Sequence, residues 1–537
     1  MIAAASAYPR GTLLDLAGQP LQPSASFGQH VRRSGANLSG TLTNWVNHVV
    51  GARLAEREKT RISEKAEDLY VNSALAHGLL EGLVVETIGI GLTPLPAPMT
   101  EHLGASAEWA DAYTTEVESL WEIWGFDPRH LCDAQRRLAH YQQQAWAYFS
   151  WKLHGIGLHQ VRMKPGAGPY RFCLLPIDAS RLVTPWKATS ADIYDGVEVD
   201  ADGAPVAVHI AKVTSPASSS RTNGDTVRVP VWHDETGLPQ VLLTADVRNV
   251  AEYKQDSVLT PIVAEIKNND DFVEAALIQA VQQTLITMYV SLQGSDQWTI
   301  PGSQGMVGGT PGQDVDWRQR IHEISKGTII EGPAGYKPEF LEPKAPGASY
   351  ETMWKSICTR VGMATQRGSE NLLREYNSSY SAALASVENA ERFSEYDRTV
   401  HVSTFCQPVF SWFLYEQALA GRLPGLRSPR AFLENLHAYT RAEWLPPPER
   451  VIRPDVRAKA EETALEARTD TLQDIYSRRG LKWKEQIRKE AAERRYRAEV
   501  GREFGVDMTR GAKPEPKSEP NGKTDPEQQQ TKGDGDS

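Results

Sequence analysis

One long run of apolar residues at helical spacing constrains the fold of this chain more than any other feature. Thr260 is a good N-cap and Pro261 suits the first helical position, so a helix is predicted to begin there. Its apolar stripe consists of Ile262, Val263, Ile266, Val273, Leu277, Ala280, Val281, Leu285, Met288, Tyr289 and Leu292. Such a helix would be about 45 Å long, which is unusual in a globular monomer. We therefore expect part of the stripe to face a partner subunit; a long core helix is the alternative.

A second apolar stripe lies beyond a glycine-rich segment. Residues 294–347 lack helical periodicity, apart from a short polar helix at 314–325 and extended pieces at 328–330 and 337–341. Helical spacing returns at Ser349. The apolar residues of this second helix are Tyr350, Met353, Trp354, Ile357, Cys358 and Val361. Because each stripe needs a neighbouring surface to cover it, the two helices favour contact between identical subunits.

The chain after the second stripe leaves the helical pattern and then resumes it. Residues 366–377 are predicted to form a polar loop, and a long helix runs from Ser378 to about Leu419. Pro408 lies inside this helix and should kink it, because proline removes one hydrogen bond and clashes with the preceding turn. Charged helices are predicted around 457–468, 470–479 and 483–500, and residues 511–537 are too polar to order themselves.

The part of the chain before Thr260 predicts an arm, then helices, then strands. Residues 1–60 are rich in Ser, Gly, Asn and Arg and form the arm. Helices are predicted over 61–88, 106–124 and 133–151, the last with Asp133 as its N-cap. Short β-rich runs separated by turn residues over 161–250 favour an antiparallel β-rich domain.

The composition excludes several classes of protein. With 537 residues, 40% hydrophobic and 23% charged, the chain is expected to be a large soluble globular protein. Its length allows roughly three or four domains. The net charge of −10 argues against a protein that coats nucleic acid, but not against loose contact with DNA. We expect a cytoplasmic product that does not enter a membrane, because no apolar run is long enough to span one and the start lacks signal-peptide features.

No group of residues indicates a catalytic, cofactor or metal site. His154 and His159 fit no metal-ligand spacing, and the glycines between Gly302 and Gly312 lack the lysine of a phosphate loop. The four cysteines form no metal-ligand pair and are expected to be buried thiols: Cys132, Cys173, Cys358 and Cys406.

Seven stretches of the sequence occur in an order that is typical of one protein family. They lie at 72–92, 121–137, 175–182, 195–207, 256–261, 370–383 and 480–486. Examples are Asp195-Gly196-Val197-Glu198-Val199-Asp200 and Asp256-Ser257-Val258-Leu259-Thr260-Pro261. Together they resemble the lambda-like family of bacteriophage portal proteins over about residues 40 to 500. Departures are the missing paired asparagines and proline in the first stretch and a missing arginine near Ser381.

This resemblance implies a fold and an assembly. The fold would be α+β and mainly helical, with wing, stem, clip, tunnel loop and crown, in a ring typically of twelve subunits around a DNA channel. The implied segments are an N-terminal arm 1–60, wing 61–255, first stem helix 256–293, clip 294–347, second stem helix 348–365, tunnel loop 366–377, long kinked helix 378–420, C-terminal wing and crown region 421–510, and disordered tail 511–537.

The resemblance also implies two groups of functional residues. The tunnel loop facing the DNA would contain Gln366, Arg367, Gly368, Ser369, Glu370, Asn371 and Arg374. The stem surface between subunits would contain Val273, Leu277, Val281, Leu285, Met288, Met353, Trp354 and Ile357. Arg367 and Arg374 would touch the DNA backbone transiently or be solvated loop charges. An acidic chain suits such a conduit, because strong phosphate contacts would slow the sliding of DNA.

The implied partners are those of a capsid vertex. They are further copies of the chain, double-stranded DNA held transiently and without sequence specificity, the terminase large subunit, a head-tail connector or adaptor, and the major capsid and scaffold proteins. The protein would be made in the host bacterial cytoplasm and reside in the virion. No catalytic activity, cofactor, metal or membrane is implied. Two alternatives stay open: a channel-less adaptor or assembly protein of a phage head, and a hydrolase with an unrecognised site.

Overall fold

The computed structural model describes most of the chain. The described residues are 52–165, 169–185, 192–212, 225–250, 252–291, 328–332, 349–373, 380–426, 428–449, 451 and 454–506. By its internal contacts the chain divides into two units, Met1–Ala55 and Glu56–Ser537. Of the first unit only 52–55 are described, as the first turn of α1 (Ala52–Asn72). The features that follow belong to the second unit.

The chain is mainly helical with antiparallel sheets, so the predicted α+β class is confirmed. The helix predicted over 61–88 is two helices, α1 and α2 (Ala74–Thr87). They are separated at Ser73, which adopts an extended conformation and accepts a hydrogen bond from the Ala76 N–H as the N-cap of α2. After α3 (Thr100–Leu103), α4 (Ala107–Gly125) begins behind the N-cap Ser106, close to the predicted position.

The helix predicted from Asp133 begins later than expected. The Asp133 carboxylate accepts hydrogen bonds from the backbone N–H groups of Gln135, Arg137 and Leu138 at 2.8 to 3.0 Å. These bonds fix a loop in which Arg136 has a φ of 56°. Asp133 therefore stabilises a turn rather than capping a helix, and α5 runs from His140 to His154.

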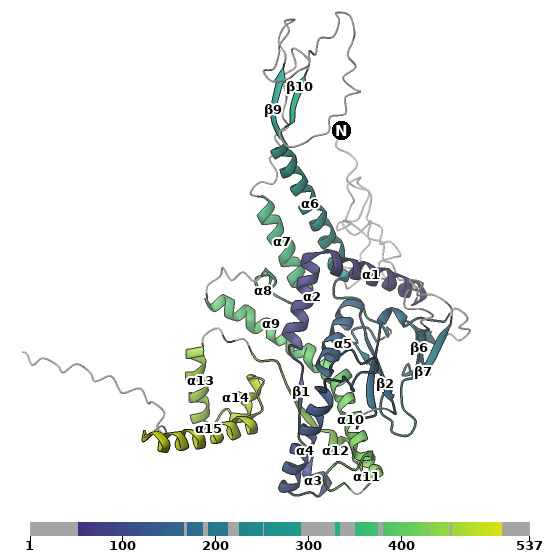
Figure 1. The fold of residues 1–537 in the computed structure, drawn as a ribbon. Coiled ribbons are helices and arrows are strands. Elements are labelled where there is room, and N and C mark those ends of the chain that lie inside the picture. Colours follow the sequence, from purple (N-terminus) through teal and green to yellow (C-terminus); the bar gives the residue numbers. More distant parts are fainter. Residues whose placement is uncertain are drawn as a thin grey trace, which may run out of the picture. The chain divides into compact units, whose positions relative to one another are not determined.

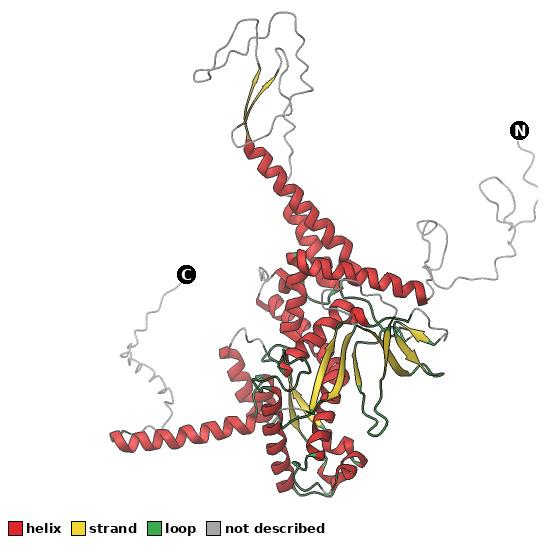
Figure 2. Ribbon diagram, turned by 45° about the vertical axis from the view of Figure 1, so that its right-hand side comes forward, coloured by secondary structure: helices red, strands yellow, loops and turns green. Residues whose placement is uncertain are grey.

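The β-rich region forms two antiparallel sheets, as predicted. The three-stranded sheet has the order β3-β2-β8 and the four-stranded sheet the order β4-β5-β6-β7. Their strands are β2 (Gly157–Met163), β3 (Phe172–Ile177), β4 (Ile193–Tyr194), β5 (Val197–Val199), β6 (Pro205–Ala211), β7 (Thr226–Pro230) and β8 (Val241–Thr244), with a 3₁₀ turn η3 (Ala179–Arg181) after β3. Figure 2 shows these strands in yellow beside the helices. A further pair joins distant segments, because β1 (Thr93–Pro96) lies antiparallel to β11 (Ala442–Leu445).

The long striped helix is shorter than the sequence predicts. A 3₁₀ turn, η4 (Thr260–Ile262), leads into α6 (Val263–Leu285), which is about 35 Å long at 1.5 Å per residue. The chain then forms strand β9 (Ile286–Ser291), which pairs in parallel with β10 (Thr328–Gly332). The reason is local, because β9 is rich in β-branched and aromatic residues that favour strands. β10 confirms the extended piece predicted at 328–330.

The second striped helix begins where predicted. α7 runs from Ser349 to Ala364, beside α6 in both views (Figures 1 and 2). An ion pair between Glu265 of α6 and Arg360 of α7 joins the two helices. The predicted polar helix at 314–325 and extended piece at 337–341 lie outside the described residues.

The predicted long helix around Pro408 contains an irregular turn. It consists of α9 (Tyr380–His401), a π-helical turn (Val402–Cys406) and α10 (Gln407–Leu419). The Gln407 N–H bonds to the Val402 carbonyl, one residue further back than in an α-helix. Because proline has no N–H and crowds the preceding turn, the wider turn directly before Pro408 accommodates it.

Short helices and charged helices complete the chain. They are α11 (Pro429–Glu434), α12 (Leu436–Thr440), α13 (Pro454–Glu466), α14 (Leu472–Arg478) and α15 (Trp483–Phe504). The last three confirm the charged helices predicted there. Among the described residues, no helix combines the length and apolar character needed to cross a membrane.

One contiguous hydrophobic core joins the helices to the sheets. Its largest fully buried side chains include Trp124, Tyr148, Phe172, Phe405 and Phe413. The four cysteines are buried free thiols, as predicted.

Three buried histidines surround Phe405 in this core. The Phe405 ring lies 4.8 Å from His159, 5.2 Å from His401 and 6.2 Å from His140, measured between centroids. Within the described part of the chain, neither ring nitrogen of His159 or His401 has a hydrogen-bond partner. Burial lowers the pKa of each of the three histidines to about 3, so they are neutral at physiological pH.

We expect this cluster to make the fold sensitive to acid. In the unfolded chain the histidines titrate near 6.5, so the unfolded state binds more protons between pH 6.5 and 3, and stability falls as the pH falls through that window. Each histidine contributes up to about 1.4 kcal/mol per pH unit. Replacing His159 with Phe should therefore reduce the stability lost between pH 7 and pH 5 by about 2 kcal/mol, as measured by urea unfolding. Equal losses in the two proteins would contradict this expectation.

Candidate functional site

The first part of the candidate site is the exposed face of α6. The helix is anchored at its start, where Ile262 and Ile266 are buried in the core. Further along, the side chains of Val273, Leu277 and Ile278 are 39%, 64% and 49% exposed. An apolar helix face that rests on core at one end and is open to solvent at the other has surface available for a neighbouring molecule.

The predicted stem residues are placed unequally. Val273 and Leu277 lie on the exposed part of α6, and Met353 on α7 is 38% exposed. Trp354 and Ile357 are half-buried on α7. Val281 and Leu285 belong to α6 and Met288 to strand β9 instead of the predicted helix, and the side chains of these three lie outside the described residues.

The second part of the site is the turn that ends α7. Gln366 has a φ of 60°, and the Arg367 N–H bonds back to the Gly362 carbonyl at 2.8 Å. A Cβ at Gly362 would lie 2.5 Å from the Arg367 carbonyl oxygen, so a glycine is required for this close approach. The chain then enters α8 (Ser369–Leu373), within the segment predicted as a polar loop.

Arg367 anchors this turn from inside. Its side chain is only 4% exposed, and its Nε lies 3.4 Å from Glu86 Oε2 on α2. Its Nη1 donates to the Ala390 carbonyl of α9 at 2.5 Å. One guanidinium therefore ties the end of α7 to α2 and α9. A DNA contact through this side chain, as the sequence suggested, would require that the pair with Glu86 open first.

The remaining predicted loop residues differ in exposure. Gln366 is exposed, whereas Gly368, Ser369 and Glu370 are half-buried. Asn371 lies in α8, but its side chain is outside the described residues, and Arg374 lies outside them altogether. Of the two arginines expected near DNA, the structure thus places only Arg367, and places it in the interior.

Removing the Arg367 side chain should destabilise the protein strongly. We expect Arg367→Ala to cost about 3 kcal/mol, because it takes one charge from a buried pair and frees a buried carbonyl. Arg360→Ala, on the helix that the turn follows, is the matched control: Arg360 is 66% exposed, and its pair with Glu265 should contribute less than about 1 kcal/mol. Urea unfolding of both variants measures the difference. Similar losses would show that the interior anchor is unimportant.

A cavity of about 350 Å³ lies beside the turn, lined by residues that include Lys152, Arg248, Gln366 and Asp397. Lys152 pairs with Asp397 at 2.9 Å and lies 4.0 Å from the centre of the Trp151 ring. Burial lowers the pKa of Lys152, and Asp397 opposes this shift. Since charges of both signs line the cavity and these two neutralise each other, it favours neither an anion nor a cation.

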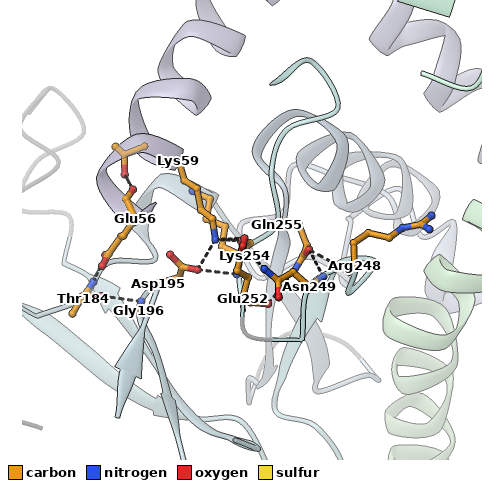
Figure 3. A network of polar contacts seen from close by, with 11 residues as sticks. Glu56, Lys59, Thr184, Asp195, Gly196, Arg248, Asn249, Glu252, Lys254 and Gln255 are labelled. Carbon is orange, nitrogen blue, oxygen red and sulfur yellow. Dashed lines mark hydrogen bonds and ion pairs between the residues drawn. The ribbon is translucent and has the colours of Figure 1, made fainter. Parts of the chain in front are cut away.

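A polar network in the segment before η4 includes Glu252 and Gln255, which also line the cavity (Figure 3). Lys59 of α1 is 8% exposed, and its Nζ lies 3.0 Å from Asp195 Oδ2, 2.7 Å from Glu252 Oε2 and 2.6 Å from the Lys254 carbonyl. Burial lowers the pKa of Lys59, but the two carboxylates outweigh it and the pKa is raised. The lysine therefore stays charged and joins α1 to the segment before η4.

Sequence reasoning missed Lys59, Lys152 and their partners. The only signal was the Asp195-Gly196 pair, which indicates a turn; both residues have positive φ. Nothing in the sequence shows that this turn meets α1. Among the described residues, no cluster of His, Cys, Asp and Glu has the arrangement of a metal site.

Comparison with known proteins identifies one family. The model of the family described as phage portal protein, lambda family, matches residues 38–398, which is more than half of the chain. A search of curated proteins gives no match. The match covers α1 to α8 and most of α9, and so includes α6, α7 and the turn that Arg367 anchors.

Proposed function

Because the chain belongs to the lambda family of phage portal proteins, we propose that it forms a ring-shaped homo-oligomer at one capsid vertex through which double-stranded DNA passes. In this role it is a structural component of the virion and not an enzyme. DNA would enter under the drive of the terminase motor and leave at ejection. The same ring would nucleate head assembly and hold the head-tail connector, and would contact the major capsid and scaffold proteins. Twelve subunits is the number we propose.

The observation that carries the proposal is the exposed apolar face of α6 within the family match. Val273 and Leu277 are accessible in the single chain, on a helix whose start is buried. In a ring the exposed face of α6 in each subunit contacts the next subunit, so this apolar surface is buried in every copy. We propose that α6 and α7 are stem helices and that 294–347 is the clip between them.

The turn after α7 indicates where the loop that faces the DNA channel would lie. The buried Arg367 holds the chain in place directly after α7, at the start of the segment 366–377. We propose that the exposed part of this loop, beginning with Gln366, faces the DNA, while Arg367 positions it. The net charge of −10 leaves DNA free to slide, because few phosphates would be bound at once.

Electron microscopy of the purified full chain tests the proposal. We expect annular particles with a central opening wide enough for duplex DNA. Compact dimers, or closed oligomers without an opening, would contradict the channel and favour a channel-less adaptor of the phage head.

A packaging assay separates the two roles further. Head assembly reactions supplied with wild-type rings should protect DNA from nuclease, and reactions without the protein should not. If DNA is protected from nuclease equally well without this protein, the proposed channel function is wrong.

A further inference from the structure

A stripe of basic residues runs along one face of α15. Lys484, Arg488, Arg495 and Arg502 are spaced by four and seven residues, so at 100° per residue they lie within about 40° of one another around the helix. Ala491 lies between them near the same face and Ala498 at one edge of it, whereas Glu499 lies at the other edge, about 20° beyond Arg488. From Lys484 to Arg502 the stripe is about 27 Å long. We call these four residues the α15 stripe.

The arginines of the α15 stripe differ from the other basic residues of the helix in their pairing. Off the stripe, each basic side chain lies near a glutamate four residues earlier. These pairs are Lys489 with Glu485 at 4.0 Å, Arg494 with Glu490 at 2.5 Å and Arg497 with Glu493 at 3.4 Å. On the stripe, Arg488, Arg495 and Arg502 form no ion pair with any described residue, and all three are exposed. The arginines of α15 without an ion pair are therefore gathered on one face, although Asp111 lies within electrostatic reach of Arg488 and Glu499 borders that face.

The start of α15 is held against the body of the protein. Lys482, just before the helix, is 13% exposed and lies between Glu118, Glu122 and Glu485 at 2.7 to 3.4 Å. Lys484, the first residue of the stripe, pairs with Asp111 of α4 at 2.6 Å. These contacts fix the orientation of the first turn of α15. The direction in which the three arginines without an ion pair extend along the helix is therefore set by that turn.

We propose that the α15 stripe binds the phosphate backbone of double-stranded DNA without sequence specificity. All three unpaired residues are arginines, whose planar guanidinium groups match the geometry of phosphate oxygens. The alanines between them allow the backbone of a ligand to come close to the helix. With only three arginines that lack an ion pair, of which Arg502 also donates to the Ala498 carbonyl at 3.2 Å, the interaction is weak and sensitive to salt, as a surface for DNA in motion requires. The choice of DNA rests on the proposed function.

Binding of a fluorescent 30-base-pair duplex to the full chain, measured by anisotropy between 50 and 200 mM NaCl, tests the stripe. The variant R488Q/R495Q/R502Q should bind more weakly, and the slope of log K against log salt should be lower by about 3, or 0.9 for each phosphate that is no longer neutralised. The control K489Q/R494Q/R497Q removes the same charge from the same helix, at paired positions, and should bind as the wild type does. Equal effects of the two variants would overturn the proposal.

Two further measurements make the outcome unambiguous. Poly-L-glutamate is used as a competing probe: a stripe-dependent affinity for it with none for the duplex would identify an acidic protein as the partner and overturn the proposal. Electron microscopy of the same samples reports ring formation separately. If rings form but DNA binding does not depend on the stripe, the proposed role of the stripe is refuted and the portal assembly is not. If DNA binding depends on the stripe but no rings form, the proposed portal assembly is refuted and the role of the stripe is not.

Discussion

Leu277→Glu should abolish ring assembly while leaving the subunit folded. Leu277 is 64% exposed on α6, so the stability of the subunit changes little when it is replaced. In the proposed ring the Leu277 side chain is buried between subunits. A glutamate there would place a charge in an apolar interface, and the hydrophobic burial of the leucine side chain would be lost. We expect a cost of about 3 kcal/mol per interface, which weakens each interface by more than about 100-fold. Sedimentation velocity should show monomers in place of large particles.

The matched control is Val71→Glu. Val71 is also an exposed apolar residue on a helix, 76% accessible on α1, but it lies outside the proposed stem. It should assemble as the wild type does, and circular dichroism should show that both variants keep their helix content. If the Leu277→Glu protein forms rings of normal size, the proposal that α6 lies at the subunit interface is wrong.

The second large effect is expected at Gly155, the residue that ends α5. Its φ is 80°, and a Cβ there would lie 1.7 Å from the Gln255 carbonyl oxygen. That backbone cannot easily move. The Gln255 side chain donates to the Glu252 carbonyl, and the Val258 N–H bonds to the Lys152 carbonyl. We expect Gly155→Ala to cost about 3 to 5 kcal/mol, because left-handed strain and a backbone clash add together.

Gly104→Ala separates these two causes. Gly104 ends α3 with a φ of 59°, but nothing lies within 4 Å of the position a Cβ would take. It should cost only about 1 kcal/mol, from the left-handed conformation alone. Urea unfolding measures both. If the two alanine variants lose the same free energy of unfolding, the close contact between the Gln255 backbone and Gly155 does not contribute to the cost of the substitution.

Local signals in the sequence predicted many of the elements correctly. Ser106 marked the start of α4, Ser349 the start of α7, and alternating apolar residues the antiparallel strands, because caps and periodicity act over a few neighbouring residues. The same local rules failed at Asp133, whose carboxylate serves a turn, and at Leu285, where the apolar stripe continues but β-branched residues begin a strand.

The candidate site was predictable only in part. The apolar stripe of α6 predicted a surface between subunits. Val273 and Leu277 are exposed in the single chain, and their place in an interface stays a prediction. Arg367 was expected in a polar loop open to solvent, yet it lies in the interior. A polar sequence around an arginine does not reveal that Glu86 and the Ala390 carbonyl, far away in the chain, are arranged to receive it.

The sequence by itself determined the helical stripes, the family and the excess of acidic charge, because spacing and composition are properties of the chain alone. The tertiary structure decided which charges are exposed and which are buried. Arg367 and Lys59 lie in the interior with carboxylate partners from other elements, whereas Arg495 on α15 is exposed to solvent, with no ion pair to any described residue. The physical reason is that the environment of a charge depends on partners brought together by folding, and nothing in the local sequence around an arginine or lysine specifies them.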